Sequence, residues 1–323
     1  MRRLRVLNAE SHEYADSARA ILRSFADLVE GQDDRAALLS ALSAHDALIV
    51  RLGHRVDEEV LLSAPALRVI VSATTGLDHI DLEAAKRRGV DVLSLKGETE
   101  FLTRVTATAE HTWALLLALM RKVPAAIADV RDGHWRRDLF RGGELAGRTL
   151  GVIGYGRLGR MVARYGLAFD MRVLVYDTRP STTLSDGIGS CTLEQLIAEA
   201  DVVSLHVPLD ATTRGMIGRT EIARMKKGSI LLNSSRGEII DSEALLDALA
   251  RGHLAGAGLD VVPDELPGTG TMSTNRLVEY ARSQENLLVT PHIGGATWES
   301  MRKTEEFMAD RLRQWAALHG FVG

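Results

Sequence analysis

A histidine near the C-terminus lies between a proline and a glycine pair, in the segment VTPHIGGATWES at residues 289–300. His292 could act as a general acid or base, because imidazole titrates near neutral pH. One such histidine does not identify a catalyst, since most loop histidines are surface or packing residues. Upstream, however, Arg236 follows the run SILLNSS, and Asp260 and Glu265 follow LAGAGL. A guanidinium is a planar donor fork suited to a carboxylate, so the set favours chemistry on a carboxylic acid.

Strands must bring these residues together, and the sequence pattern predicts them. Short β-branched runs alternate with amphipathic helical stretches such as 15–30 and 82–89, as in parallel α/β folds. In the first hundred residues we expect strands at 4–8, 46–51, 68–72 and 90–95. A second series predicts strands at 149–154, 172–177, 201–207, 229–235, 254–261 and 286–292. Arg236, the carboxylates and His292 then follow successive strands, at the sheet edge where open α/β folds bind ligands.

The second series opens with a glycine motif. A predicted strand leads directly into a predicted helix through Gly154, Tyr155, Gly156, Arg157, Leu158 and Gly159. In a dinucleotide-binding fold these glycines permit a tight turn, the approach of the pyrophosphate and close packing of helix on strand. The next strand ends at Asp177, where an acid can accept hydrogen bonds from a ribose and repel a 2′-phosphate. We therefore expect NAD rather than NADP, although Arg179 two residues later weakens that preference.

Length and pattern together predict two domains, because 323 residues with 46% hydrophobic content exceed one ordinary core. A long apolar helix over 106–123 separates the two series of strands. A final helix over 296–319 is followed by no further predicted strand. The predicted fold is α/β, with two Rossmann-like or flavodoxin-like domains, doubly wound parallel sheets and an active-site cleft between them. We predict a discontinuous substrate-binding (catalytic) domain of residues 1–103 and 295–323, and an NAD-binding Rossmann domain of residues 104–294.

Composition excludes several classes of partner. A formal charge of −4 is too mild for nucleic acid or an anionic membrane to be the expected partner. The single Cys191 excludes an internal disulfide and fits a reducing compartment. The basic N-terminus is followed by polar residues rather than an apolar core, and no apolar run approaches a membrane span. We expect a cytoplasmic protein and assign no metal ligands.

Several segments resemble the signatures of the D-isomer-specific 2-hydroxyacid dehydrogenase family, in particular its D-3-phosphoglycerate dehydrogenase-like members. These segments are residues 72–82, 107–112, 154–159, 206–213, 233–237, 260–265 and 291–295. The resemblance implies an NAD-dependent oxidoreductase that transfers a hydride between NAD(H) and C2 of a D-2-hydroxy acid or 2-oxo acid. It also implies a homodimer built on the region of the long apolar helix, which carries more hydrophobic surface than two facing domains need.

The same resemblance implies roles for individual residues. Arg236 would hold the substrate carboxylate and polarise the C2 oxygen, while Glu265 would hydrogen-bond His292, the general acid/base, and favour its protonated form. Backbone amides near Thr75 and Gly76 would bind the substrate carboxylate. Asp260 would bind the nicotinamide carboxamide. The remaining cofactor-binding candidates are Thr108, His206, Val207, Pro208, Thr213, Asn233, Ser234, Ser235 and Gly294, together with His292 and the glycine motif.

The sequence departs from the family pattern in places. Leu266 separates Glu265 from Pro267, and an additional stretch over 268–286 contains apolar spacing that suggests a short helix. This stretch is either a surface insertion or part of the cleft wall. Taken one at a time, the cations Arg51, Lys96 and Arg104 are expected to be ordinary surface residues. Together they would suit a substrate with a second anionic group, with Arg51 and Lys96 as substrate-binding candidates.

Two sets of alternatives stay open: the places of the tryptophan side chains, and functions other than 2-hydroxyacid dehydrogenation. Trp113 and Trp135 are expected in the core, and Trp298 either covers a substrate or packs. An NAD(H)-sensing, corepressor-like protein with little turnover would also retain the Arg–Glu–His set, although no long tail or basic recognition element supports it. An alanine dehydrogenase or formate dehydrogenase would need other side chains at the nicotinamide. Reduction of a 2-oxo acid needs a hydride at C2 and a proton at its oxygen, which His292 could supply.

Overall fold

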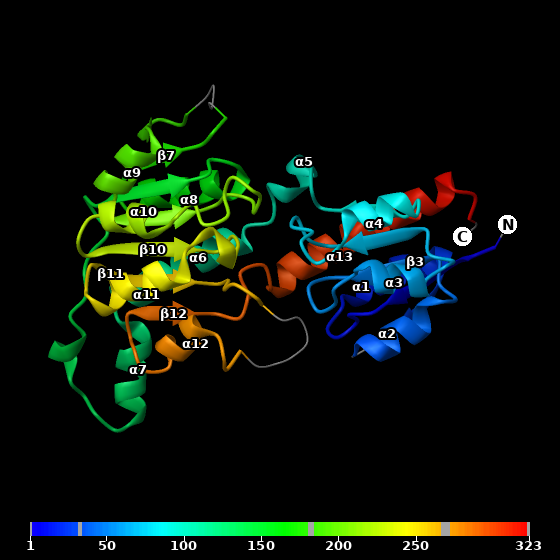
Figure 1. The fold of residues 1–323 in the computed structure, drawn as a ribbon, viewed down its shortest axis with the longest axis horizontal. Coiled ribbons are helices and arrows are strands. Elements are labelled where there is room, and N and C mark those ends of the chain that lie inside the picture. Colours follow the sequence, from blue (N-terminus) through cyan, green and yellow to red (C-terminus); the bar gives the residue numbers. More distant parts are fainter. Residues whose placement is uncertain (1, 32–33, 180–183, 266–271, 322–323) are drawn as a thin grey trace. The chain divides into compact units, whose positions relative to one another are not determined.

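The computed structural model describes residues 2–31, 34–179, 184–265 and 272–321, which form two compact units (Figure 1). Unit 1 contains Met1–Val105 and Thr297–Gly323, and unit 2 contains Thr106–Glu265 and Met272–Ala296. The changes of unit fall at residues 105/106 and 296/297, within two residues of the boundaries expected from the sequence.

Unit 1 has a parallel sheet in the order β2-β1-β3-β4-β5. The strands are β1 (Leu4–Asn8), β2 (Ala26–Glu30), β3 (Ala47–Val50), β4 (Val69–Ser72) and β5 (Asp91–Ser94). Because successive side chains of a strand face opposite ways, one face packs on α1 (Asp16–Phe25) and α13 (Trp298–Leu318). The other face packs on α2 (Arg35–Leu42), α3 (Glu58–Ser63) and α4 (Leu82–Arg87). A short helix, α5 (Thr99–Leu102), follows the sheet. Strands β2 and β3 lie on opposite sides of β1, so the order of the strands across the sheet reverses between β1 and β3.

The four strands predicted for this unit are present, but the predicted helix over 15–30 is wrong in its second half. The helix ends at Phe25, and residues 26–30 form the edge strand β2. No glycine or proline separates the two elements, so the helical pattern runs on without a stop signal. The side chains of β2 alternate in burial after Ala26, which is the strand period.

Unit 2 has a seven-stranded parallel sheet in the order β12-β11-β10-β9-β6-β7-β8. The six predicted strands are β6 (Thr149–Ile153), β7 (Arg172–Tyr176), β9 (Val202–Leu205), β10 (Ser229–Asn233), β11 (Leu254–Leu259) and β12 (Leu287–Val289). A seventh, β8 (Ile188–Ser190), was not predicted, because its sequence Ile-Gly-Ser contains one large apolar residue, whereas the equally short β12 is Leu-Leu-Val. The sheet order reverses between β6 and β9, which makes their carboxyl ends the expected ligand site.

Helices cover both faces of this sheet. One face packs on α6 (Ala107–Met120) and α8 (Arg157–Ala168). The other packs on α9 (Leu193–Glu199), α10 (Arg219–Arg224) and α11 (Ser242–Ala250). A 3₁₀ turn, η2 (Gly237–Ile239), follows β10, and α12 (Arg276–Ala281) is the short helix predicted within 268–286. Leu266, Pro267 and residues 268–271 lie outside the described residues.

The predicted single helix over 106–123 is wrong at its end. It stops at Met120, Lys122 adopts a left-handed conformation with φ of 51°, and α7 (Val123–Arg131) then begins with a proline in its first turn. The apolar side chains of α6 are buried against the sheet of unit 2, so the surplus apolar surface expected on that helix is absent.

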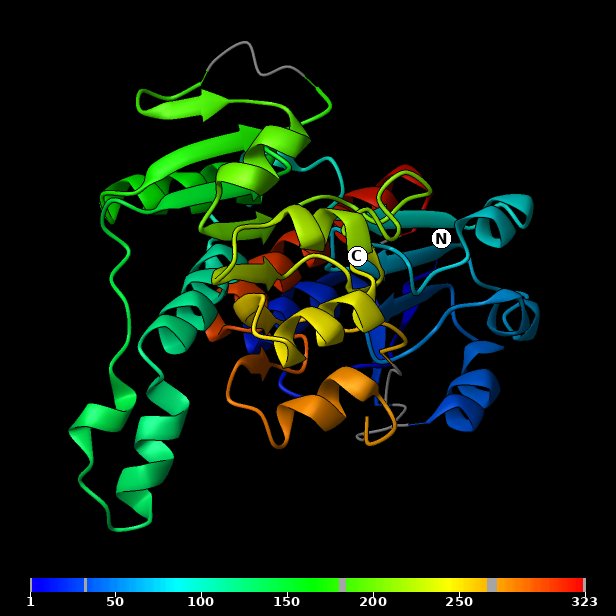
Figure 2. The same ribbon diagram turned by 60° about the vertical axis from the view of Figure 1, so that its left-hand side comes forward.

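Several exposed apolar side chains lie instead on an arm formed by α7 and η1 (Arg137–Phe140). Figure 2 shows this arm lying apart from the sheet of unit 2. Trp135, between the two helices, is 86% exposed, so its predicted core position is wrong, whereas Trp113 is buried and stacks on Phe169. The other exposed apolar side chains of the arm are Val123, Ile127, Val130 and Leu139.

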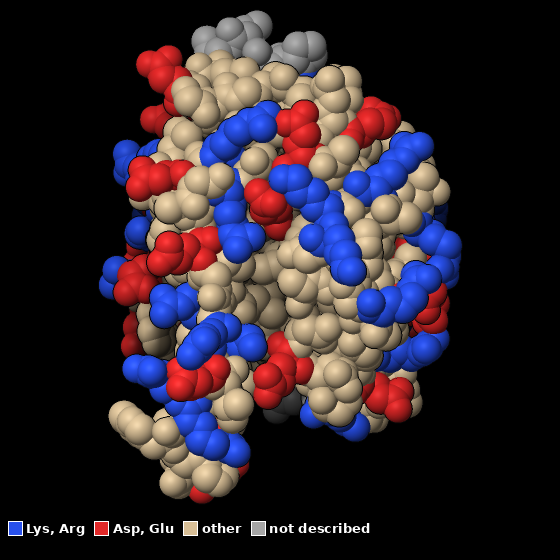
Figure 3. Space-filling model, turned by 90° about the vertical axis from the view of Figure 1, so that its left-hand side faces the viewer, with Lys and Arg blue, Asp and Glu red and all other residues tan. Residues whose placement is uncertain are grey.

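Charges of both signs are interspersed on the face of unit 2 that Figure 3 shows. Among the described residues, no helix combines the length and apolarity needed to cross a membrane. The same part of the chain has no group of three or more His, Cys, Asp or Glu side chains arranged to hold a metal ion.

Candidate active site

The glycine motif forms the turn from β6 into α8. Gly154 has φ of +92°, and a Cβ there would lie 2.6 Å from the carbonyl oxygen of His206, so only glycine fits. A Cβ on Gly159 would lie 1.9 Å from the carbonyl oxygen of Gly154, which shows how closely α8 packs on the strand. A Cβ on Gly156, the residue that precedes α8, would meet nothing within 4 Å. The backbone at Gly156 therefore borders open space at a helix N-terminus, where an anion binds favourably.

Asp177 lies directly after β7, beside this turn. Its Oδ2 accepts a hydrogen bond of 2.8 Å from the amide of Tyr155, and its Oδ1 accepts one from the amide of Arg179. The Arg179 side chain is 88% exposed and its Nε is 3.8 Å from the carboxylate. Asp177 is thus held at the strand end next to the glycine turn, where an acceptor for ribose hydroxyls is needed.

His206 follows β9 at the point where the sheet order reverses. Burial lowers the pKa of His206 to about 4, so its imidazole is neutral at physiological pH. The Nε2 atom lies 2.8 Å from Ser204 Oγ, while Nδ1 is buried with no hydrogen-bond partner among the described residues. A buried nitrogen without a hydrogen-bond partner, at the place where the strand order reverses, fits a ligand group that would form the missing hydrogen bond.

Other cofactor candidates surround the same edge. Val207, Pro208 and Thr213 lie in the loop after β9, where Thr213 Oγ1 donates to the carbonyl oxygen of Pro208 at 2.6 Å. Thr108 lies on α6, and its Cγ2 would be 3.4 Å from a Cβ built on Gly294. The structure therefore brings Thr108 and Gly294 together, although they are far apart in the sequence.

The loop after β10 presents Arg236 and is fixed by its own hydrogen bonds. Asn233 Nδ2 donates to the carbonyl oxygen of Arg236, and Asn233 Oδ1 accepts from the amide of Ser235. Ser235 Oγ donates to Leu205 on the neighbouring strand, and Ser234 Oγ lies 2.8 Å from Thr112 Oγ1 on α6. These contacts orient the backbone from which the Arg236 side chain extends.

Glu265 and His292 form the pair that the resemblance implied. Nδ1 of His292 lies 2.6 Å from Oε2 of Glu265, and both side chains are about a third exposed, at 28% and 33%. The other oxygen of Glu265 accepts a hydrogen bond of 2.8 Å from the amide of Val262. Glu265 engages Nδ1, so the carboxylate anchors the ring on the side opposite Nε2.

Close packing links this pair to the loop that carries Arg236. A Cβ on Gly237 would lie 2.1 Å from the carbonyl carbon of Val262, so the loop after β10 touches the loop after β11. Val262 in turn binds Glu265, which binds His292. Three neighbouring strand ends therefore contribute to one site within unit 2.

Asp260 is buried and holds the backbone of the histidine loop. Its carboxylate accepts hydrogen bonds from the amides of Ile293 and Gly294 and from Thr290 Oγ1, at 2.7–2.9 Å. Burial opposes its ionisation, but hydrogen bonds from His111, Thr290 and Gly294 outweigh that effect and hold the pKa of Asp260 below its usual value. The fixed loop keeps His292 in a left-handed conformation, with φ of 53°.

In unit 1 the loop after β4 carries Thr75, which is exposed, and Gly76. Thr74 Oγ1 donates to the carbonyl oxygen of Gly76 and lies 2.8 Å from Ser72 Oγ, which in turn lies 3.2 Å from Nε2 of His79. These contacts shape the loop.

Three other candidate residues of the sequence have exposed side chains. Lys96 follows β5, Arg104 precedes α6, and Trp298 begins α13.

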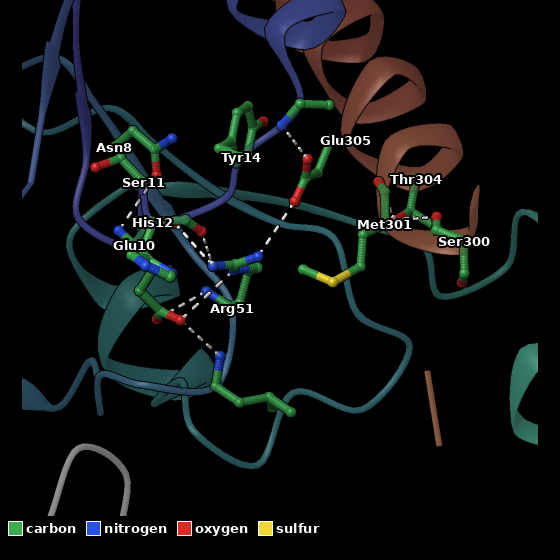
Figure 4. A network of polar contacts seen from close by, with 12 residues as sticks. Asn8, Glu10, Ser11, His12, Tyr14, Arg51, Ser300, Met301, Thr304 and Glu305 are labelled. Atoms are coloured by element: carbon green, nitrogen blue, oxygen red, sulfur yellow. Dashed lines mark hydrogen bonds and ion pairs between the residues drawn. The ribbon is translucent and has the colours of Figure 1, made fainter. Parts of the chain in front are cut away.

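The guanidinium of Arg51 is hydrogen-bonded to other groups of the protein, which the sequence did not indicate. Figure 4 shows its guanidinium between Glu305 and the chain after β1. Nη1 donates to Glu305 Oε1 at 3.3 Å, and Nη2 donates to the carbonyl oxygens of Glu10 and His12 at 3.1 Å. Since these groups occupy the donor fork, the structure does not support Arg51 as a substrate ligand.

Sequence reasoning missed several residues that position the site. His111 Nε2 lies 2.9 Å from Thr290 Oγ1 and 3.2 Å from Asp260 Oδ1, and Thr112 contacts Ser234. His111 and Thr112 lie in the family-like segment ATAEHT, which was their only signal in the sequence. Glu10 and Glu305 stand in no motif.

Comparisons with known proteins show what the chain is similar to. A family model described as D-isomer specific 2-hydroxyacid dehydrogenase, NAD binding domain, matches residues 113–294. D-3-phosphoglycerate dehydrogenase of Mycobacterium tuberculosis is 39% identical over 87% of this chain and 51% of that protein. The chain thus spans about half the length of such relatives. Glyoxylate reductase of Pyrococcus furiosus is 38% identical over 88% of this chain and 83% of that protein.

A solved structure shows the same fold. The D-lactate dehydrogenase from Aquifex aeolicus, complexed with NAD and lactic acid, has a TM-score of 0.84 and 31% identity, over 98% of this chain and 96% of that chain.

Proposed function

Since the chain belongs to the D-isomer-specific 2-hydroxyacid dehydrogenase family, we propose that it interconverts a D-2-hydroxy acid and the corresponding 2-oxo acid with NAD(H). The observation that carries the proposal is the hydrogen bond of 2.6 Å between His292 and Glu265, in the same unit as a glycine turn of the dinucleotide-binding kind. Relatives named glyoxylate reductase and hydroxypyruvate reductase support small 2-oxo acids as the substrate class.

The residues of unit 2 fit NAD. The open space at Gly156, the acceptor Asp177 and the orphaned Nδ1 of His206 suit a pyrophosphate, a ribose and a further polar group of the cofactor. When bound, NADH supplies the hydride to C2 of the oxo acid. Asp260 contributes by fixing the loop of His292, and its carboxylate lies next to Gly294.

His292 is proposed as the group that moves the proton. In reduction, its imidazolium Nε2 protonates the C2 oxygen, and in oxidation the neutral ring removes that proton. Glu265 holds the ring by Nδ1 and stabilises the charged form with its carboxylate. Arg236 would bind the substrate carboxylate and draw electron density from the C2 oxygen.

In unit 1, the backbone amides of Thr75 and Gly76 are proposed to bind the substrate carboxylate. Thr74 supports this role, because it engages the carbonyl oxygen of Gly76 and so sets the orientation of the loop. Lys96 remains a candidate substrate contact through its exposed position after β5.

We also propose a homodimer, with the arm of α7 and η1 as the contact surface. The arm exposes Val123, Ile127, Val130, Trp135 and Leu139, and monomeric proteins rarely expose so many large apolar side chains together. Figure 3 shows the arm projecting at one end of unit 2. A two-fold contact would cover the same patch on both copies. The single Cys191 supports a reducing, cytoplasmic location.

The test separates turnover from cofactor sensing. We expect His292→Ala to lose about 10²–10⁴ in kcat, both for reduction of a 2-oxo acid and for oxidation of the 2-hydroxy acid. NADH affinity, measured by fluorescence titration, should persist, because the glycine turn and Asp177 are distinct from the proton donor. A wild-type protein that binds NADH tightly yet reduces none of a panel of 2-oxo acids would instead support an NAD(H)-sensing protein.

A further inference from the structure

Glu10 occupies an anion-binding loop in unit 1. The loop follows β3, and four consecutive backbone amides in it, those of residues 51–54, all donate to the Glu10 carboxylate. Oε1 accepts from Arg51 and His54 at 2.9 and 3.2 Å, and Oε2 accepts from Leu52 and Gly53 at 3.2 and 3.0 Å. Successive amides that converge on one point form a concavity that binds anions. Figure 4 shows the carboxylate beside Arg51.

The sequence of the loop permits this close approach. A Cβ on Gly53 would lie 3.1 Å from the carboxyl carbon of Glu10, so a larger residue there would push the carboxylate away. The Glu10 side chain is only 13% exposed, and Arg51 Nε lies 3.9 Å from its Oε2. The carboxylate is therefore a fixed part of the loop rather than a surface charge.

The loop also lies at the place where this fold binds ligands. The sheet order β2-β1-β3-β4-β5 reverses between β1 and β3, and ligands of such sheets bind outside the carboxyl ends of the strands at that reversal. Glu10 follows β1, and residues 51–54 follow β3. At the place where the strand order reverses, the protein therefore binds its own carboxylate: Glu10, after β1, accepts hydrogen bonds from the amides of residues 51–54, after β3.

The filled loop is next to the proposed carboxylate-binding loop. Strands β3 and β4 pair in register, with Val50 opposite Ser72, so the loops at 51–54 and 73–76 leave the sheet at the same level. Neighbouring strands lie about 4.8 Å apart. A 2-oxo acid held by Thr75 and Gly76 can therefore direct the group on its C3 atom toward the Glu10 loop.

We infer that Glu10 is a specificity-determining residue that disfavours 2-oxo acids carrying a second anionic group. This inference rests on the proposed function and refines its substrate class to monoanionic acids. A phosphate or second carboxylate would find the four amides already used, the Arg51 fork occupied, and a fixed negative charge in their place. It reverses the sequence-based hypothesis of a dianionic substrate.

The experiment compares hydroxypyruvate with 3-phosphohydroxypyruvate, which differ only by the phosphate. For the wild type, we expect a lower KM with hydroxypyruvate. For Glu10→Ala, the ratio of the two KM values should move by about 10- to 100-fold toward the phosphorylated acid, as expected for new hydrogen bonds to an anion. Glu83→Ala, which removes an exposed carboxylate of the same unit, should leave the ratio unchanged.

A second measurement needs no turnover, so it separates failure of this inference from failure of the proposed function. Inorganic phosphate should bind Glu10→Ala and raise its Tm, but neither effect should appear with wild type or Glu83→Ala. If Glu10→Ala does not fold, Glu10→Gln keeps the side-chain size while removing the charge, and should shift the KM ratio in the same direction by less. An unchanged ratio together with no phosphate binding to the Glu10 variant, or a wild type that prefers the phosphorylated acid, would overturn the inference.

Discussion

Replacement of Arg51 by methionine tests whether this residue supports the fold or binds substrate. Its partner Glu305 is 1% exposed and also accepts a hydrogen bond of 2.7 Å from the amide of Ala15, at the start of α1. Arg51→Met would leave that carboxylate buried without its cation, and would free the carbonyl oxygens of Glu10 and His12. Loss of one partner of a buried ion pair costs about 3–5 kcal/mol, and the 21% exposure of Arg51 places the expected loss at about 3 kcal/mol. The corresponding fall in Tm is roughly 10 °C.

The loss should depend on pH through Glu305. Burial already raises the pKa of Glu305 above its usual value, against hydrogen bonds and charges that lower it, including those of Arg51. Without Arg51 the pKa of Glu305 rises further, so the folded protein binds a proton more readily than the unfolded chain. Such a group contributes stability below its unfolded pKa that is lost as pH rises through its folded pKa. The defect of Arg51→Met should therefore be largest above neutrality and shrink as pH falls toward 5.

Thermal unfolding by circular dichroism between pH 5 and 8 measures both effects. Arg87→Met is the matched control, because Arg87 forms an ion pair of the same 3.3 Å length with Glu58 but both side chains are more than half exposed. This control should cost less than about 1 kcal/mol at any pH. A wild-type Tm for Arg51→Met, with a raised KM for a 2-oxo acid, would show that Arg51 serves the substrate and refute the reasoning.

Three further predictions concern the site and the assembly. Because Asp177 repels a 2′-phosphate, kcat/KM should be higher with NADH than with NADPH, and Asp177→Asn should narrow that difference; the reverse order in wild type would contradict the assignment. Glu265→Gln should lower kcat in reduction, though less than His292→Ala does, because the ring keeps a hydrogen-bond partner but loses the negative charge; an unchanged kcat with hydride transfer rate-limiting would argue against it. Light scattering at micromolar concentration should give a dimer mass for wild type and a monomer mass for Ile127→Asp, whereas a monomeric wild type would remove the dimer proposal.

The elements with strong local patterns were predictable from the sequence. Most of the ten predicted strands are buried β-branched or apolar runs, and burial on both faces is what produces such runs in parallel sheets. The glycine motif was equally clear, because Gly154 and Gly159 are required by contacts that no other residue permits. Strands β2 and β8 were missed for local reasons: the helical pattern of α1 runs on into β2 without a stop signal, and Ile188 is the one large apolar residue of β8.

Residues that act through tertiary contacts were not predictable in the same way. Glu10 lies 41 residues from Arg51, and His111 lies 179 residues from Thr290, so no local spacing relates the partners. Arg51 was assigned to substrate from its position after a strand. The contacts of its guanidinium depend on Glu305, which the final helix supplies. The His292–Glu265 pairing was implied by the family resemblance rather than by spacing, and the structure places the two side chains in contact.

Transfer of deuterium to a 2-oxo acid from NADH that carries deuterium at both C4 positions tests the central claim most directly. Incubation of the protein with hydroxypyruvate, glyoxylate or pyruvate, followed by mass spectrometry and chiral chromatography of the product, follows the hydride to its destination. The proposed function predicts deuterium at C2 of the hydroxy acid, a D-configured product wherever C2 is chiral, and loss of this product in His292→Ala. An unlabelled product, a product of L configuration, or NADH binding without any labelled hydroxy acid would contradict it.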